Sequence, residues 1–276
     1  KALIVEAPEG TMDIVGTGGD GIGTYNISTA TAFVVAGCGV RVAKHGNKAV
    51  SSKSGAADVL SSLGIKLDCE MALVSRALDE AGICFLMAPR HHSAMRHVGP
   101  VRAELGVRTI FNMLGPLANP ALVKRIMVGV FAPELCVPFA HALANLGTTH
   151  AWVVHGADGL DEVSTTGETK VAALADGTVS EFTISPDDIG LPTVPISDLH
   201  GGTPEENAAS LRAILEGATG PYRDVVVLNA AAALVGGGHA DSLQDAAARA
   251  EASIAEGKAL AALDRLVAIT NSGDAA

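Results

Sequence analysis

The chain has 276 residues, of which 48% are hydrophobic and 3% aromatic, and it contains 31 glycines. This composition is typical of an α/β protein with a core of Ala, Val and Leu, and it excludes a disordered or fibrous chain. A formal net charge of −11 argues against broad binding to nucleic acid or to acidic membranes, because both require clustered cations.

The cysteines and the apolar runs bear on the cellular compartment. Isolated thiols without C-x-x-C spacing predict buried residues in a reducing cytoplasm; they are Cys38, Cys69, Cys84 and Cys136. The longest apolar run covers residues 225–235, is broken only by Asn229, and is too short to span a bilayer. We therefore expect a cytoplasmic protein with no membrane partner and no signal peptide.

The first predicted strand, residues 12–15, runs into a glycine-rich turn and then into a predicted helix over residues 29–37. Five glycines and Asp20 lie within residues 16–23. Glycines allow positive φ and let a ligand approach main-chain N–H groups, and the types of Asn26, Ser28 and Thr29 suit a helix start. The free N–H groups and partial positive charge of that start predict an anion site, most often one for phosphate.

Two nucleotide motifs compete for this turn. Gly16, Gly18 and Gly21 satisfy G-x-G-x-x-G, but a dinucleotide site also needs an acid about 20 residues further on. Lys44 stands at the end of the next strand instead. No G-x-x-x-x-G-K-[ST] is present, so a Walker-type loop is not supported.

A second polar loop follows the next predicted strand, residues 40–43. It runs from Lys44 to Gly55 and contains cations, hydroxyls and glycines. Parallel neighbouring strands end at one edge of a sheet, where ligands of open α/β sheets bind, so we expect both loops to share one crevice. Lys44 is a natural point charge for phosphate in that crevice.

The chain then changes character. The sequence predicts helices over 56–63 and 70–81 and then an apolar strand over 82–89. Residues 91–120 follow, and they show helical patterns at 94–105 and 109–114. A zinc site is conceivable there, but a polar pocket wall is the better interpretation of its histidines, His91, His92 and His97. Of its arginines, Arg96, Arg102 and Arg108, one could hold a planar carboxylate through a bidentate pair.

The second half alternates strand and helix, which predicts a mostly parallel sheet with right-handed crossovers. The expected elements are strands 125–131 and 150–155, a helix over 133–146, a hairpin of 170–174 with 179–184, and helices from 203, over 223–234 and over 242–269.

An acidic pair follows the strand at 150–155. Asp161 and Glu162 sit in a glycine turn at the same sheet edge as the two polar loops. Mg²⁺ takes one or two carboxylates and fills its other positions with water and substrate phosphate, so this pair is a candidate magnesium site. Asp158 competes as a ligand, and no pattern indicates a covalent nucleophile.

These motifs together resemble the anthranilate phosphoribosyltransferase family. The resemblance runs from about Asp13 to the last helix, with fitting spacing throughout. It rests on GTGGD at 16–20, NIST at 26–29, KHGN at 44–47, SSKSG at 51–55, Arg102, NMLGPLANP at 112–120 and Asp161–Glu162.

The resemblance implies a reaction in which anthranilate attacks 5-phosphoribosyl pyrophosphate (PRPP), pyrophosphate leaves and N-(5-phosphoribosyl)anthranilate forms, the second step of the tryptophan branch. The residues that would hold PRPP are Gly16, Gly19, Asp20, Thr24, Asn26, Ile27, Ser28, Thr29, Lys44, His45, Gly46, Asn47, Lys48, Ala49, Val50, Ser51 and Ser52. Those that would bind anthranilate are Gly16, Asn47, His92 and Arg102. Mg²⁺, as two ions with PRPP bound, would take Ser28, Asp161 and Glu162.

The implied fold is α/β: a large domain with a mostly parallel central sheet flanked by helices, plus part of a small helical domain. Residues 1–90 and 121–276 would form the large domain, and residues 91–120 the remaining segment of the small one. Members of the family begin with helices that build much of the small domain and the contact of a homodimer, and we expect this sequence to lack them. Two alternatives share the scaffold: a pyrimidine nucleoside phosphorylase, and a non-catalytic relative that binds nucleic acid.

Overall fold

The computed structural model describes residues 3–48, 54–105 and 109–274. Its sheet has the strand order β3-β2-β1-β4-β5-β6-β7. The strands are β1 (Met12–Gly16), β2 (Val42–Gly46), β3 (Ile83–Met87), β4 (Arg125–Gly129), β5 (His150–Gly156), β6 (Thr169–Ala175) and β7 (Thr178–Ile184). The first five run parallel and the last two form an antiparallel hairpin, as the sequence predicted.

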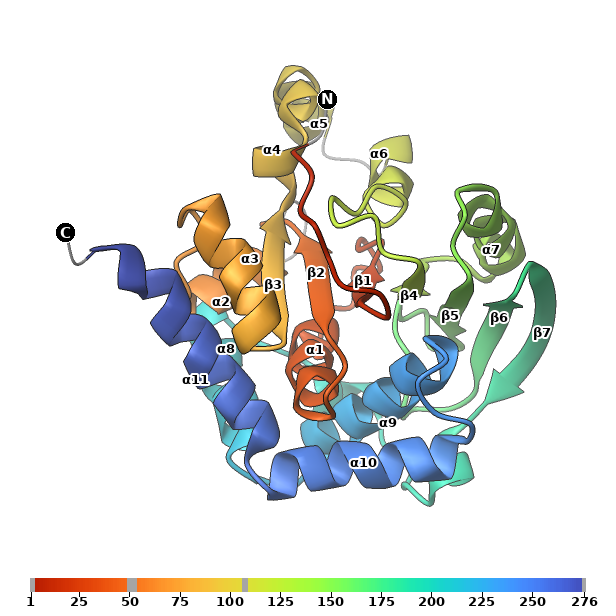
Figure 1. Cartoon of the computed structure of the whole chain (residues 1–276). Coiled ribbons are helices and arrows are strands. Elements are labelled where there is room, and N and C mark those ends of the chain that lie inside the picture. Colours follow the sequence, from red (N-terminus) through yellow and green to blue (C-terminus); the bar gives the residue numbers. More distant parts are fainter. Residues whose placement is uncertain (1–2, 49–53, 106–108, 275–276) are drawn as a thin grey trace.

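Helices cover both faces of the sheet (Figure 1). The α-helices are α1 (Ile27–Gly37), α2 (Ala56–Ser62), α3 (Met71–Glu80), α4 (Ala88–His91), α5 (Gly99–Leu105), α6 (Ile110–Leu114), α7 (Cys136–Asn145), α8 (Pro204–Leu215), α9 (Pro221–Gly236), α10 (Leu243–Ala255) and α11 (Lys258–Asn271). One apolar cluster joins α1, α9 and α11 to the sheet, and a second joins α7 to β4, β5 and β6. The helices α4, α5 and α6 gather at one end of the molecule, and we call residues 88–120 the helical segment (Figure 1).

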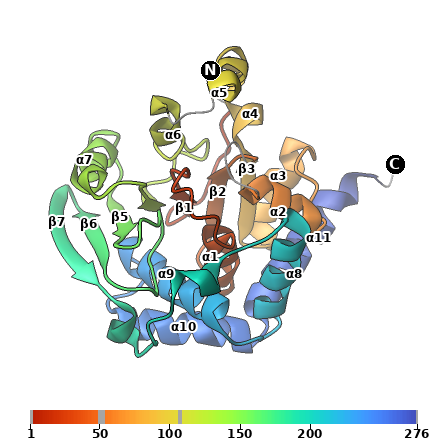
Figure 2. The same ribbon diagram turned by 180° about the vertical axis from the view of Figure 1, so that it is seen from behind.

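The strand order places a crevice at one point of the sheet. The chain moves from β1 outward to β2 and β3, then crosses back to β4 on the other side of β1. Right-handed crossovers in opposite directions put α1 and α7 on opposite faces. Between β1 and β4 the connections diverge, and ligands of open α/β sheets bind outside the strand ends at such a point. From behind, the chain after β1 lies between β5 and α8 (Figure 2).

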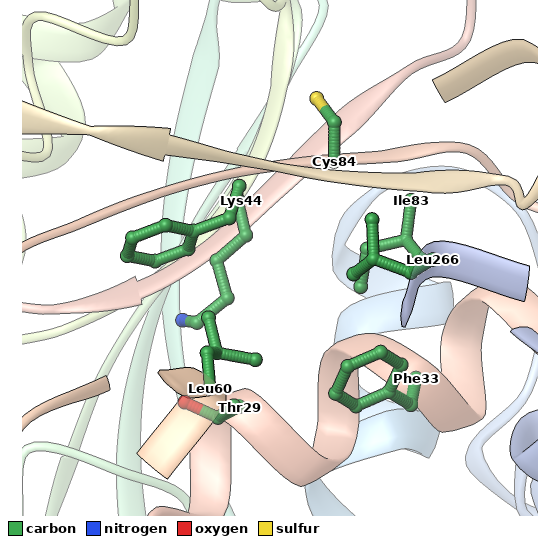
Figure 3. Close-up of a pocket in the computed structure, with 8 residues that line it drawn as sticks. Thr29, Phe33, Lys44, Leu60, Ile83, Cys84 and Leu266 are labelled. Atoms are coloured by element: carbon green, nitrogen blue, oxygen red, sulfur yellow. The ribbon is translucent and has the colours of Figure 1, made fainter. Parts of the chain in front are cut away.

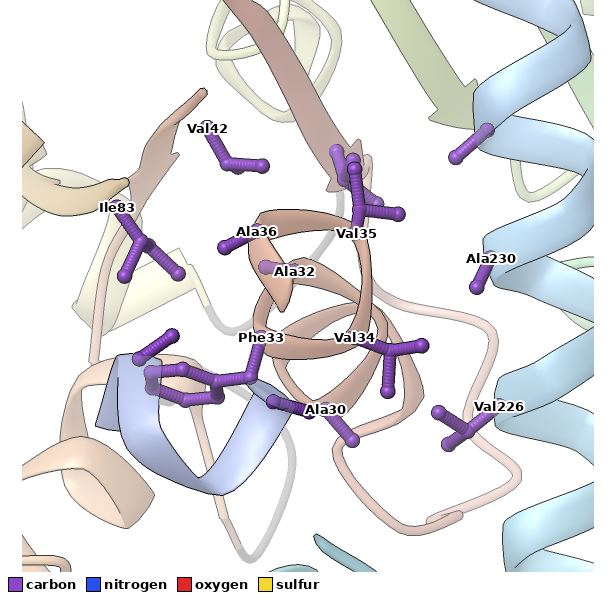
Figure 4. Packing of buried hydrophobic residues seen from close by; sticks show 14 of the residues in the cluster. Ala30, Ala32, Phe33, Val34, Val35, Ala36, Val42, Ile83, Val226 and Ala230 are labelled. Atoms are coloured by element: carbon purple, nitrogen blue, oxygen red, sulfur yellow. The ribbon is translucent and has the colours of Figure 1, made fainter. Parts of the chain in front are cut away.

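Helix α1 lies at the centre of the larger core. Its apolar residues face both the sheet and α9, and Phe33, Val34 and Val35 are fully buried. Figure 4 shows Val34 facing Val226 and Ala230 of α9, while Phe33 points toward the other side of the helix. A helix that is apolar all round must be enclosed by other elements, so the start of α1 is held firmly at the crevice.

Three predicted elements differ from the structure. Strand β2 extends to Gly46, because residues 42–46 pair with β3 along its whole length, so Lys44 and His45 belong to a strand and not to a loop. The pattern at 94–105 divides into a 3₁₀ turn, Ser93–His97, and α5. The pattern at 242–269 divides into α10 and α11, because Gly257 adopts a left-handed φ of 68°.

The other boundaries agree with the sequence within a few residues. Helix α8 begins as its pattern predicts: the Thr203 hydroxyl accepts a hydrogen bond from Glu206 N, and the Glu206 carboxylate accepts one from Thr203 N. Among the described residues, no helix combines the length and the apolar character that crossing a bilayer requires.

Candidate functional site

The glycine loop after β1 is shaped by backbone conformation. Gly18 and Gly21 adopt φ values of 68° and 78°, and a Cβ at either position would meet nothing within 4 Å. The left-handed conformation, and not a lack of space, therefore requires glycine at these positions. The loop is fastened by main-chain bonds from Tyr25 N to Leu199 O and from Gly201 N to Gly23 O, and Thr24 forms a bridge with His200.

Asn26 connects three separate parts of the site. Its side chain makes no capping bond to α1. Its Nδ2 donates to Ser54 O at 3.3 Å, and its Oδ1 accepts from Ser54 Oγ at 3.2 Å and from Asn207 Nδ2 at 3.0 Å. Asn26 therefore joins the end of the glycine loop to the end of the second polar loop and to α8, as the predicted shared crevice requires.

Asp161 and Glu162 reach this same place from the loop after β5. The Asp161 carboxylate accepts a hydrogen bond from Gly18 N at 2.6 Å, and Glu162 accepts one from Ser28 N at 3.1 Å. Both residues are buried, with 7% and 8% of their surface exposed. Burial chiefly raises the pKa of Glu162 to about 7, and burial together with the charge of Glu162 raises the pKa of Asp161 well above its usual value.

Two glycines at the strand ends make room for this acidic loop. A Cβ on Gly129 would overlap the main chain of Asp161, and a Cβ on Gly16 would overlap its carboxylate. These residues lie directly opposite one another in the β1–β4 pair. Gly16, which the family resemblance marks as a ligand residue, therefore also has a local packing role beside Asp161.

Lys44 lies under the start of α1. Its ammonium group donates to Ile14 O at 2.6 Å and to Ser28 Oγ at 3.2 Å, and its side chain points from β2 toward Thr29 (Figure 3). Burial lowers its pKa, and the nearby carboxylate of Asp13 counteracts that effect. A cavity of about 10 Å³ beside Lys44 and Thr29 has room for about one water.

Asp158 makes its hydrogen bonds within its own loop, unlike Asp161 and Glu162. Its carboxylate accepts hydrogen bonds from Ser164 Oγ and Thr166 Oγ1, each at 2.6 Å, and from Leu160 N at 3.1 Å. These contacts hold the loop closed upon itself. The structure therefore separates Asp158 from Asp161 and Glu162, although sequence alone left it as a competing metal ligand.

His45 faces away from Lys44, as alternation along a strand requires. Its Nδ1 lies 3.0 Å from Gly115 O, and its ring contacts His92 edge to face at 5.2 Å between centroids. His91 turns elsewhere, with its Nδ1 2.7 Å from Leu3 O. The histidines of the helical segment thus have different partners, and the described residues contain no cluster of three His, Cys, Asp or Glu that could hold a metal.

The remaining predicted ligand residues are placed as follows. Ile27 is buried and its N–H donates to Tyr25 O, while Gly19 and Asp20 lie in the glycine loop. Asn47 and Lys48 are exposed just after Gly46, the last residue of β2. Arg102 lies in α5, but its side chain is outside the described part; Ala49, Val50, Ser51 and Ser52 also fall outside the described residues.

Sequence reasoning missed several buried polar residues that organise the site. The Asp13 carboxylate accepts from Asn119 Nδ2 at 2.7 Å and from His45 N at 3.1 Å, which ties the end of the helical segment to β1 and β2. Asn207 and Asn229 are the others. A polar residue within an apolar run is a visible signal for Asn229, whereas nothing near Asn207 in sequence suggests its partner Asn26.

The donor set fits Mg²⁺. Ser28 Oγ and the carboxylates of Asp161 and Glu162 carry hard oxygen donors, and Mg²⁺ usually takes one or two carboxylates from a protein. Close to them lie the N–H groups of Gly18 and Ser28, which suit phosphate. Burial raises the pKa of both carboxyls, and a bound cation would favour their ionised forms.

Known proteins that are similar to this chain indicate its family. Residues 9–260 match the family described as "Glycosyl transferase family, a/b domain". A protein from Paramagnetospirillum magneticum named anthranilate phosphoribosyltransferase is 59% identical over 271 residues, which cover 98% of this chain and 78% of that protein.

Solved structures of anthranilate phosphoribosyltransferases have the same fold as this chain. The anthranilate phosphoribosyltransferase of Thermus thermophilus superposes with a TM-score of 0.92 at 45% identity, covering 98% of this chain and 81% of that one. The Saccharomyces cerevisiae enzyme in complex with PRPP and Mg superposes with a TM-score of 0.88 at 34% identity, covering 98% and 77%.

Proposed function

Because the chain belongs to the anthranilate phosphoribosyltransferase family, we propose that it transfers the phosphoribosyl group of PRPP to the amino group of anthranilate. The products are N-(5-phosphoribosyl)anthranilate and pyrophosphate, in the second step of the tryptophan branch. The observation that carries this proposal is the meeting of the glycine loop, the start of α1 and the Asp161–Glu162 pair at one strand-end crevice.

PRPP binds, in this proposal, across the glycine loop and the start of α1. Gly18 N and Ser28 N would donate to its phosphates, and Lys44, which bonds to Ser28 Oγ, would add positive charge. Both N–H groups now donate to the carboxylates of Asp161 and Glu162. A phosphate and a carboxylate therefore compete for the same donors, and substrate binding requires the acidic pair to turn toward another partner.

Magnesium is that partner in our proposal, as two ions with PRPP bound, held by Ser28, Asp161 and Glu162. The yeast relative in complex with PRPP and Mg supports the metal. Bound Mg²⁺ supplies charge that stabilises the departing pyrophosphate. The protein contributes fixed N–H donors, which need little reorganisation when negative charge develops.

Anthranilate approaches from the side of the helical segment. We propose that Asn47, His92 and Arg102 hold it, next to Gly16. The aniline nitrogen is neutral at pH 7, so it can attack without a strong base, and we assign no acid or base. Positioning by these residues then supplies much of the remaining rate enhancement.

Further proposals concern organisation. We propose that residues 1–90 and 121–276 form the large domain and that residues 91–120 belong to a small helical domain. We also propose a cytoplasmic protein that can form a family-like homodimer, and the four free cysteines, of which three are buried, support a reducing compartment. Light scattering during size-exclusion chromatography tests the dimer.

The reaction is tested by the loss of anthranilate fluorescence when protein, Mg²⁺ and PRPP are mixed. We expect a loss that requires all three. Phosphorolysis of a pyrimidine nucleoside without anthranilate turnover would favour the phosphorylase alternative. Capture of single-stranded DNA without any turnover would favour the non-catalytic alternative, which the net charge of −11 and the complete acidic pair count against.

A further inference from the structure

Asn229 is a buried polar residue that the proposed mechanism does not use. It lies in α9 within the apolar run 225–235, and none of its surface is exposed. A buried amide without partners costs about 1–3 kcal/mol, so its presence in such a helix needs a reason. Its neighbours Val226 and Ala230 face Val34 of α1 (Figure 4). Asn229 instead hydrogen-bonds Val163, in a different element.

That element is the acidic loop. Asn229 Oδ1 accepts a hydrogen bond from Val163 N at 3.0 Å, and Asn229 Nδ2 donates to Val163 O at 2.7 Å. Nδ2 also donates to Val225 O, one turn earlier in α9, at 2.8 Å. The amide thus holds both main-chain groups of Val163, the residue directly after Glu162, and fixes them to the body of a long buried helix.

We propose that Asn229 is a positioning residue for the Asp161–Glu162 pair and thereby sets the affinity for the divalent cation; this inference rests on the proposed function. Gly129 leaves no free space on the β4 side, since a Cβ there would overlap the Asp161 main chain. Asn229 holds the following residue from the α9 side. The main chain of the acidic pair is therefore held between a strand end and a helix, while its carboxylates can turn toward the cation.

The choice of amide follows from these contacts. Holding one N–H and one C=O of the same residue requires a side chain that both accepts and donates, which Asn does in one plane. Leucine matches its shape and keeps neither bond. Aspartate keeps the acceptor for Val163 N but places its second oxygen against Val163 O and Val225 O. Groups behind metal ligands typically change metal affinity or activity 10–100-fold when they are replaced.

The experiment measures the Mg²⁺ concentration that gives half of the rise in unfolding temperature with PRPP present and anthranilate absent, so that no turnover occurs. The variants are Asn229→Leu and Asn229→Asp. Ser253→Ala is the matched control, because the Ser253 hydroxyl is also buried and donates to Val34 O of α1 at 2.8 Å, and not to the acidic loop. The KM for anthranilate and for Mg²⁺ is then measured in the transfer assay.

We expect Asn229→Leu to raise the half-saturating Mg²⁺ concentration about tenfold or more, with a smaller rise for Asn229→Asp and an anthranilate KM within twofold of wild type. Ser253→Ala should lower the unfolding temperature without changing the Mg²⁺ midpoint. If the Asn229 variants only lose stability, as Ser253→Ala does, the positioning role is overturned. Wild-type protein that shows neither a Mg²⁺-dependent rise nor transfer would instead overturn the proposed function. If Asn229→Leu fails to fold, Asn229→Asp decides the question.

Discussion

The acidic loop follows β5 and the helical segment follows β3 at the same edge of the sheet, but the two are built in opposite ways. In the acidic loop, Asp161, Glu162 and Ser164 are buried, and each has partners from the main chain or from neighbouring side chains. In the helical segment the helices have 4, 7 and 5 residues, and large apolar side chains stand exposed: Val101, Leu105, Ile110 and Leu114. Isolated helices this short are unstable in water, so packing must determine their positions.

This difference in packing matches what each of the two substrates needs from its binding site. Phosphates and a cation need fixed dipoles and charges, which strand ends, a helix start and a tightly bonded loop provide. A small aromatic acid needs a shaped wall, which a less integrated segment can supply. Asn119 ties the end of the helical segment to β1 and β2, because its side chain donates to Asp13 and to Ala43 O. Variants in the acidic loop and variants in the helical segment should therefore separate metal and phosphate effects from anthranilate effects.

The largest expected effect belongs to Glu162→Gln. Removing one of the two carboxylates from the proposed metal site should lower kcat/KM on the order of 10³-fold, because several kcal/mol of charge stabilisation are lost. The unfolding temperature at pH 8 should not fall, since burial raises the pKa of Glu162 to about 7 and its ionised form is disfavoured in the folded protein. Transfer kinetics measure the fall in kcat/KM, and calorimetry measures the unfolding temperature.

Glu168→Gln is the matched control, because Glu168 lies exposed in the same loop. It should change neither quantity. A Glu162→Gln protein that loses activity only in proportion to lost folded protein would show that this carboxylate supports the loop and does not act in the site.

His45 of β2, which contacts the helical segment, gives the next effect. Its pKa is lowered from 6.5 to about 4, chiefly by burial and secondly by the neighbouring His92. The unfolded chain therefore binds more protons between these pH values, and the His45 contribution to the free energy of unfolding falls as pH decreases through that window, by up to about 3 kcal/mol. Urea unfolding at pH 7 and pH 4.5 measures the difference in the free energy of unfolding between wild type and His45→Asn at each pH.

The comparison with a variant is necessary because Asp13 acts in the opposite direction. Burial raises its pKa from 3.8 to about 6, so its contribution favours the folded state at low pH and is lost as pH rises through that range. Replacement of the exposed His141 by Asn is measured alongside as the surface control. A His45→Asn difference that does not vary between pH 7 and pH 4.5 would contradict a buried neutral His45.

Arg102→Ala tests the proposed anthranilate contact in the helical segment. Losing a bidentate pair to the anthranilate carboxylate, worth about 1.5–3 kcal/mol, should raise the KM for anthranilate about 10- to 100-fold while the KM for PRPP stays within threefold. Arg96→Ala, in the same segment, should change neither. Equal losses for both substrates would remove Arg102 from the anthranilate site. Steady-state kinetics with each substrate varied in turn distinguish these outcomes.

How far the sequence could predict the structure also differs between the regions. Glycine, capping and strand signals are local, so they predicted β1, α1, α8 and the parallel sheet, and the sheet edge then brought Glu162 to Ser28. The contacts of Asn207 and Asn229 join residues 181 and 66 positions apart, and no local pattern encodes such a partner. In the helical segment, short helices gave weak periodicity, and residues 94–105 were predicted as one helix. Two features of the site stay predictions: the number of metal ions, and the roles of Asn47, His92 and Arg102.

The smallest expected effect concerns the exposed face of the helical segment. Leu105 is 57% exposed, so Leu105→Ser should change the free energy of unfolding of the isolated chain by no more than about 0.5 kcal/mol. The buried Leu78 of α3 is the contrast, because Leu78→Ala leaves a cavity and should cost about 2–5 kcal/mol. Urea unfolding at two protein concentrations measures both. If Leu105→Ser instead destabilises strongly, and more at the higher concentration, a second copy covers this face in solution, because only an associating state makes stability depend on protein concentration. The same measurement therefore tests the proposed homodimer from the side of the molecule where the fold leaves apolar surface uncovered.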